Sequence, residues 1–336
     1  MKALRFLGNG KLELVEAPRP EPKGDEVLLK VKACAMCSTD VNSRFLASQP
    51  LPVIPGHEIS GEIVAVDRPI YVKLGERVSL TVHAPCGYCE PCRRGDGAFC
   101  ENLSKYGSLR DGGNAEYVLV KETSCLPLPD DFSFDDGALI GDTLGTSYHG
   151  IKKLAVNPRD KVLVVGGGPI GITVARIAMW LGADVVLAEI GKYRINLARE
   201  LGITNIIDTG EDDFRGFVDG FTEGKGFDHV AECGGNSTTF QMALDAARVG
   251  GRVVLISMVK SAEISPQMVI CPKELTIMGS WNFNIHEYRE MVHFYKHNRD
   301  LVKLITHHYP LEKAAEAYEL FIQGKSGKIV FQPWSS

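Results

Sequence analysis

The sequence predicts an α/β protein with two domains, one rich in β-strands and the other a doubly wound parallel sheet. From residue 1 to about residue 129, short β-type runs are separated by Gly and Pro, which is typical of a barrel-like or sandwich-like domain. From about residue 161, strand and helix patterns alternate, as they do in parallel sheets. A chain of 336 residues with 44% hydrophobic residues is sufficient for two cores.

The expected elements follow one another in a simple order. The amino-terminal strand candidates are KLELVE, EVLLKVKA, ISGEIVAV, ERVSLTV and AEYVLV. The second region begins with the strand KVLVVG and the helix ITVARIAMWLG and continues with the strands VVLAE, TNIID, FDHVAE, RVVLIS and LTIMGS, with a helix through INLARELG. The carboxyl-terminal region contains the helical stretches HEYREMVHFYKHN and LEKAAEAYELFIQG and then a terminal strand KIVFQP, which we expect to rejoin the first domain.

The composition favours small-molecule chemistry in the cytoplasm. The formal net charge of -5 lacks the basic surplus that binding to nucleic acid or anionic membranes needs. The amino terminus lacks the apolar run of a signal peptide, and the apolar stretch 162–188 is interrupted by Arg176 and Asp184. Nine cysteines, an odd number without a secretion signal, favour reduced thiols and metal ligation over disulfides. We expect a cytoplasmic protein without a nucleic-acid or membrane partner.

A glycine motif marks a candidate dinucleotide site. The strand KVLVVG runs directly into Gly166, Gly168 and Gly171, which spell G-x-G-x-x-G with Pro169 and Ile170 inside the motif, and a helix begins there. Such glycines permit a tight turn and close approach of the backbone to a pyrophosphate at the helix amino end. A tight turn with a purely structural role is the alternative.

The next strand ends at an acidic residue, Glu189, near the offset of about 20 residues that a ribose-binding carboxylate shows. A carboxylate accepts hydrogen bonds from both ribose hydroxyls but repels a 2′-phosphate, so Glu189 predicts NAD over NADP. Arg194 lies close enough in sequence to weaken that preference. A solvated charge at a strand end is the alternative for Glu189.

Four cysteines within fifteen residues, CGYCEPCRRGDGAFC, form the strongest metal motif of the chain. Cys86, Cys89, Cys92 and Cys100 are separated by two, two and seven residues, and spacers of two are typical of zinc-binding turns. Four thiolates close a tetrahedral shell and leave no position for substrate, so this site is predicted to be structural. An iron–sulfur cluster is the competing interpretation.

A catalytic zinc needs an open shell with about three protein ligands. Cys37 in CAMCSTD, His57 in PGHE and Asp142 in GDTLGTSYHG would supply sulfur, nitrogen and oxygen. Their spacing alone does not group them. Each also has a structural interpretation: a small buried cysteine, a loop histidine and a helix N-cap.

Taken in order, CAMCSTD, PGHEISGEIVAVD, the four-cysteine loop, RDGGNAEYV, GGGPIG and GKIVFQP resemble the zinc-containing medium-chain dehydrogenase/reductase family, which includes alcohol and polyol dehydrogenases. The resemblance covers nearly the whole chain. It implies a catalytic domain of GroES-like β-barrel type at 1–145 with a structural zinc lobe at about 86–100. It also implies a Rossmann NAD-binding domain at 146–284 and a segment 285–336 that returns to the catalytic domain.

The resemblance also implies roles for single residues. It makes Cys37, His57 and Asp142 the catalytic zinc ligands, so that two zinc ions and NAD are expected per chain. Asp40 matches the carboxylate that orients the ligand histidine. Glu58 matches the glutamate that lies near the metal and ligates it transiently in the family; whether it does so here stays open.

Thr39 matches the hydroxyl that receives the substrate proton in the family. Many relatives continue this relay to a histidine three positions later, where this chain has Asn42. Asparagine cannot act as a base near pH 7, so we expect release through water, with Glu58 or a histidine as receiver. The implied reaction is reversible oxidation of an alcohol, with zinc as the Lewis acid and hydride transfer to NAD.

The aspartate ligand and the short chain resemble the secondary-alcohol and polyol branches. We therefore predict oxidation of a polyol, sugar, cyclitol or a phosphate of one of these, with Arg110 and the WNFN stretch at 281–284 as candidate polar contacts. L-Threonine or a simple secondary alcohol is the alternative substrate. A zinc-free reductase or a non-catalytic dinucleotide-binding protein is the alternative of a different class. Relatives are usually homodimers or homotetramers, which we expect here.

Overall fold

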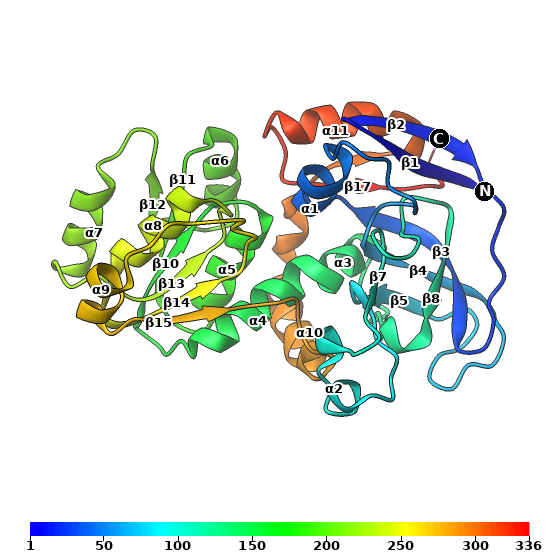
Figure 1. Ribbon diagram of the computed structural model, residues 1–336, viewed down its shortest axis with the longest axis horizontal. Helices are drawn as coiled ribbons and strands as arrows, with labels where there is room; N and C mark the ends of the chain where they lie inside the picture. Colours follow the sequence, from blue (N-terminus) through cyan, green and yellow to red (C-terminus); the bar gives the residue numbers. More distant parts are fainter. Residues whose placement is uncertain (336) are drawn as a thin grey trace. The chain divides into compact units, whose positions relative to one another are not determined.

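A computed structural model describes residues 1–335 and divides the chain into two compact units (Figure 1). The first comprises Met1–Asp142, Asn284–Arg289 and residues 304–335, and the second comprises Thr143–Phe283 and Glu290–Lys303. The domain boundaries expected near residues 145 and 284 thus fall at 142/143 and 283/284. Residues 290–303 do not group with the first unit as expected for the whole segment 285–336, because His293, Phe294 and His297 pack on Trp180 of the second unit.

The first unit is built on a sheet of seven strands. Its order is β16-β17-β3-β4-β5-β9, and β8 also pairs with β3. Every pair except β16·β17 is antiparallel. The bounds are β3 Glu26–Ala35, β4 Glu58–Val66, β5 Arg77–Leu80, β8 Tyr117–Lys121, β9 Cys125–Pro127, β16 Ile305–Tyr309 and β17 Lys328–Phe331.

Two hairpin-like pairs and short helices complete this unit. The pairs are β1 Lys2–Gly8 with β2 Lys11–Glu16, and β6 His83–Ala84 with β7 Ser104–Lys105. The helices are α1 Ser38–Asp40, α2 Glu90–Arg93, α3 Phe134–Leu139 and α11 Ala314–Ile322. An aromatic cluster of Phe6, Phe45 and Tyr318 packs α11 against β1 and the helical turn Val41–Phe45, with the Phe6 and Tyr318 rings edge to face at 5.4 Å.

The second unit is a six-stranded parallel sheet in the order β12-β11-β10-β13-β14-β15. The strands are β10 Lys161–Val165, β11 Asp184–Glu189, β12 Ile206–Asp208, β13 Phe227–Glu232, β14 Ala247–Leu255 and β15 Thr276–Gly279. The order reverses between β10 and β13, and ligands of such sheets bind beyond the carboxyl ends of the strands at this point.

Helices cover the sheet of the second unit. They are α4 Gly145–Leu154, α5 Pro169–Trp180, α6 Lys192–Glu200, α7 Phe214–Thr222, α8 Ser237–Ala246 and α9 Pro266–Val269. Helix α10, Tyr288–His297, begins in the first unit, and its later residues pack on Trp180 of α5. Helices α7 and α8 bury Val218 and Leu244 against Leu163 and Val165 of β10, which explains the apolar run of this central strand. Within residues 1–335, the structure contains no helix with the length and apolar character of a membrane span.

Candidate active site and zinc centres

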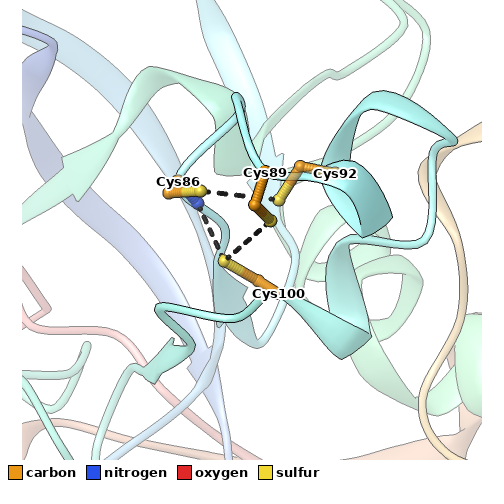
Figure 2. A group of neighbouring side chains, drawn as sticks. All are labelled: Cys86, Cys89, Cys92 and Cys100. Carbon is orange, nitrogen blue, oxygen red and sulfur yellow. Dashed lines mark hydrogen bonds between the residues drawn. The ribbon is translucent and has the colours of Figure 1, made fainter.

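Four cysteine sulfurs point toward one another between β6 and β7 (Figure 2). Cys89 caps the amino end of α2, and Cys100 follows a short 3₁₀ turn. The Sγ atoms of Cys86 and Cys92, and likewise those of Cys89 and Cys100, are 3.9 Å apart. Sulfurs at the corners of a tetrahedron with Zn–S bonds of about 2.3 Å are about 3.8 Å apart. The four side chains therefore fit a closed zinc shell.

The cysteine loop stabilises the thiolate form of one of its members, Cys86. Burial acts to raise the pKa of the Cys86 thiol, but the N–H groups of Tyr88 and Cys89 donate to its sulfur and hold the pKa at about 6. Burial raises the pKa of Cys92 to about 12 and also raises that of Cys100. Because a metal deprotonates the thiols that coordinate it, zinc binding here releases the protons of Cys92 and Cys100.

A second group of metal-ligating side chains lies in the first unit. Cys37 follows β3 and caps the amino end of α1, His57 immediately precedes Glu58 at the start of β4, and Asp142 lies in a π-helical turn after α3. One ligand atom from each of these four residues lies within 4.8 Å of the others. The structure thus brings the three predicted catalytic ligands together with Glu58. Sulfur, imidazole nitrogen and carboxylate oxygen form a donor set that zinc accepts.

Asp40 holds the imidazole of His57. The carboxylate Oδ1 of buried Asp40 lies 3.0 Å from His57 Nδ1, and His57 Nε2 lies 3.3 Å from Asp142 Oδ2. Burial acts to lower the pKa of His57, but the Asp40 and Asp142 carboxylates raise it well above its ordinary value. When Nδ1–H donates to Asp40, the lone pair of Nε2 is directed at the cluster, which is the arrangement of a ligand histidine.

Glu58 forms a buried ion pair that the sequence analysis did not anticipate. Its partner is Lys328 of β17, whose ammonium also donates to the carbonyl of Met36 at 3.2 Å. Glu58 is 0% and Lys328 4% exposed. Burial raises the pKa of Glu58 to about 7 against the opposing effect of Lys328. The only sequence signal for Lys328 was its place in the terminal strand.

The expected proton relay is incomplete in this chain. Thr39 is half-buried in α1, whereas Asn42, at the position of the relay histidine, is exposed. Arg44 lies one turn after Asp40 and contacts its carboxylate. The guanidinium of Arg44 therefore fixes the orientation of the Asp40 carboxylate, which in turn holds His57.

His83 was also missed, although it precedes the first cysteine of the structural loop by three residues. It is buried in β6, and its Nε2 atom has no hydrogen-bond partner among residues 1–335. Burial first, and Lys105 second, lower its pKa to about 4, and the charges of Asp142 and His57 also act on it. A neutral imidazole therefore lies close to the metal cluster.

The glycine turn of the second unit has the geometry of a dinucleotide site. Gly166 has φ +103°, and a Cβ on Gly171 would lie 1.8 Å from the carbonyl oxygen of Gly166. A Cβ on Gly168 would meet nothing within 4 Å, so this residue leaves room for a ligand. Pro169 is the first residue of α5, and the hydroxyl of Ser147 donates to the carbonyl of Ile170 at 3.2 Å. The contact with Ser147 holds the amino end of α5 in place, and the free space at Gly168 lets a pyrophosphate approach its backbone.

Glu189 lies at the carboxyl end of β11 and reaches this turn. Its Oε2 accepts the N–H of Gly167 at 2.6 Å. The Nε atom of Arg194 is buried without a partner in the described part of the chain, which leaves a donor for a ligand. Of the other sequence candidates, Arg110 is paired with Glu26 at 2.8 Å, and Phe283 of the WNFN stretch packs on Gly145.

Known proteins match both units. The family profile described as "Alcohol dehydrogenase GroES-like domain" matches residues 23–130, and that described as "Zinc-binding dehydrogenase" matches residues 169–297. L-Threonine 3-dehydrogenase of Shewanella putrefaciens is 32% identical over 98% of this chain and 99% of its own. Two solved structures share the fold. Galactitol-1-phosphate dehydrogenase from Escherichia coli is 26% identical, with a TM-score of 0.88 over 99% of this chain and 100% of its own. 2R,3R-butanediol dehydrogenase from Bacillus subtilis is 27% identical, with a TM-score of 0.87 over 99% of each chain.

The fold and the two metal centres define a zinc-dependent dehydrogenase with a Rossmann cofactor domain. The chain belongs to the zinc-containing medium-chain dehydrogenase/reductase family. It is an alcohol/polyol dehydrogenase that uses zinc and NAD. The predictions of fold class, family, enzyme class and cofactors are therefore confirmed, and the zinc-free and non-catalytic alternatives are excluded.

Proposed function

We propose that this enzyme oxidises a secondary alcohol that carries a heteroatom on the neighbouring carbon and an anionic group, with a polyol or sugar phosphate as the first candidate. The cluster of Cys37, His57 and Asp142 carries the proposal, because three protein ligands leave one position of a tetrahedral zinc shell that a substrate hydroxyl or carbonyl oxygen can take. Threonine, butanediol and galactitol phosphate, named in the three relatives, each contain a secondary alcohol beside a carbon that bears nitrogen or oxygen.

The residues of the first unit have distinct tasks in this reaction. When bound, zinc supplies Lewis acidity that makes the substrate hydroxyl more acidic, and NAD supplies the hydride acceptor. Asp40 holds the His57 ring through Nδ1. Thr39 receives the substrate proton and passes it to water, because Asn42 has no basic atom near pH 7. Lys328 opposes the effect of burial on Glu58 and so favours the ionised form of this carboxyl beside the cluster.

Positive charge beside the cluster supports an anionic substrate. Lys105 of β7 is paired in register with His83 of β6. Its charge acts on His83, and burial together with the charge of Arg44 lowers the pKa of Lys105. Arg44 in turn contacts Asp40, which holds the ligand histidine. Since ammonium and guanidinium groups favour nearby carboxylates and phosphates, a substrate with such a group is stabilised here.

The test is a panel of matched substrates with NADH formation as the readout. Sugar alcohols are compared with their phosphates, and (2R,3R)-butanediol serves as the neutral small diol. We expect higher kcat/KM for the phosphates, and Lys105→Met should raise KM for them while KM for the neutral alcohols stays within about twofold, since one charged hydrogen bond contributes about tenfold. Equal kcat/KM for neutral and anionic members would contradict the anionic preference.

L-Threonine is the second candidate because the relative with 32% identity acts on it. Its carboxylate would use the same positive charge at Lys105. L-Threonine and its amide form the matched pair for this case. Oxidation of L-threonine in preference to every polyol phosphate of the panel would assign the enzyme to this second substrate.

A further inference from the structure

The carboxyl ends of β11 and β12 place two carboxylates side by side. Glu189, the last residue of β11, is paired in register with Asp208, the last residue of β12. Paired residues on neighbouring parallel strands project to the same face about 4.8 Å apart. Both side chains therefore lie at the sheet edge where the ribose of a dinucleotide binds in this fold.

Glu189 is already engaged by the backbone. Its Oε2 accepts from the N–H of Gly167, and its Oε1 accepts from the N–H groups of Ile190 and Gly191 at 2.9 and 2.8 Å. This carboxylate therefore fastens the glycine turn to the start of α6. Replacement of Glu189 would loosen the turn for either cofactor, so Glu189 alone is not a clean determinant of the choice between NAD and NADP.

A lysine follows Glu189 by three residues in the sequence. Lys192 is the first residue of α6 and follows Gly191, whose N–H is bonded to Glu189. Its ammonium forms ion pairs with Asp208 and, at 2.6 Å, with Glu211. We call Lys192, Asp208 and Glu211 the Lys192 ion-pair cluster. The hydrogen bond from Lys192 lowers the pKa of Asp208, so this carboxylate stays ionised at neutral pH.

The Lys192 side chain is 61% exposed and has a flexible four-carbon stem. A lysine in this position is a suitable point charge for a ribose 2′-phosphate. In the structure, however, its charge is directed to two carboxylates that belong to β12 and the turn after it. A 2′-phosphate, with about two negative charges, meets this acidic edge instead of a free ammonium.

We propose that Asp208 and Glu211 are positioning residues for cofactor selectivity: they hold Lys192 away from the ribose 2′ position and so favour NAD over NADP. The inference deepens the proposed function and rests on its cofactor, but not on its substrate. Glu189 retains its role toward the ribose. The preference for NAD over NADP therefore depends on the Lys192 ion-pair cluster in addition to Glu189.

The proposal is tested by binding of NADH and NADPH to the zinc-loaded enzyme, followed by nicotinamide fluorescence without substrate. The ratio of the two Kd values is the measured quantity. In Asp208→Asn/Glu211→Gln we expect a shift of at least about tenfold toward NADPH, the effect of one charge-assisted hydrogen bond to phosphate. Adding Lys192→Met to this variant should remove the shift, whereas Lys192→Met alone should change the ratio by less than about twofold.

A matched control is Asp219→Asn/Glu223→Gln on α7 and just after it. Those carboxylates pair with Arg215 and Lys225 at exposed positions, so the net charge changes equally and the ratio should stay constant. Glu211→Gln alone, at an exposed position, should give a smaller shift in the same direction as the double variant. The proposal would be overturned by an unchanged Kd ratio in Asp208→Asn/Glu211→Gln, or by a shift that persists when Lys192→Met is added to that variant. In either case, binding of NADH would still support NAD as the cofactor. A wild-type enzyme that binds neither dinucleotide would overturn both.

Discussion

The buried ion pair between Glu58 and Lys328 makes a quantitative prediction. Lys328→Met keeps the length of the side chain but leaves the carboxylate of Glu58, which is 0% exposed, without a counter-charge. Removing one member of a buried pair costs about 3–5 kcal/mol. Proton uptake by Glu58 limits the penalty to the lower end of this range, because a carboxyl with a pKa of about 7 already binds a proton in part at pH 7.

We therefore expect a loss of about 3 kcal/mol at pH 7, which corresponds to a fall in Tm of about 6–12 °C for a unit of this size. The loss should shrink by less than about 1 kcal/mol at pH 6, because Glu58, with a pKa of about 7, binds a proton at that pH in the wild type as well. Differential scanning calorimetry of the zinc-loaded protein at both pH values measures it. Glu58→Gln/Lys328→Met, in which both charges are absent, should recover most of the stability.

The control is Lys2→Met, which breaks an exposed ion pair with Glu312. Surface pairs contribute at most about 1 kcal/mol, so Tm should fall by less than about 4 °C. If Lys328→Met melted no lower than Lys2→Met, or if the double variant were no more stable than Lys328→Met alone, the buried pair would not have the energetic role assigned to it.

The remaining predictions concern the two metal centres and the relay. Cys92→Ser should lower the zinc content, measured by elemental analysis, from two ions to one and lower Tm before it affects kcat; a normal Tm with abolished turnover would contradict the structural assignment. Cys37→Ser should also lose one zinc but retain the far-UV circular dichroism of the wild type and lose NADH formation by about 10²-fold or more. Asn42→His should supply a base that titrates near pH 6.5, so the pH profile of kcat should shift, and an unchanged profile would exclude this position from proton release.

The features that sequence alone predicted are local ones. The cysteines of the structural centre lie within fifteen residues, and the glycine turn lies between one strand and one helix. Their chemistry follows from spacing because the chain between the ligands is too short to allow other arrangements. Grouping Cys37 with His57 and Asp142 required the family resemblance, since three separate elements deliver these side chains to one place.

Lys328 and His83 escaped prediction for a related reason. Lys328 reaches Glu58 because β17 pairs with β3, nearly 300 residues earlier, and no local pattern encodes that pairing. His83 lies in a two-residue strand that is too short to give a periodic signal. Both side chains have ordinary sequence surroundings, and only their tertiary environment marks them as charged or neutral groups beside the metal cluster.

The pairing of β17 with β3 also has a consequence for biosynthesis. Val330 and Phe331 pair with Ala35 and Cys34, so the edge of β3 that precedes Cys37 stays unpaired until residues nearly 300 positions later have been synthesised. At about 5–20 residues per second, a ribosome needs about 15–60 s to translate the intervening 300 or so residues. During that time this strand edge is open to wrong partners. A nascent chain that ends before residue 328 has neither the edge partner nor the lysine that neutralises Glu58.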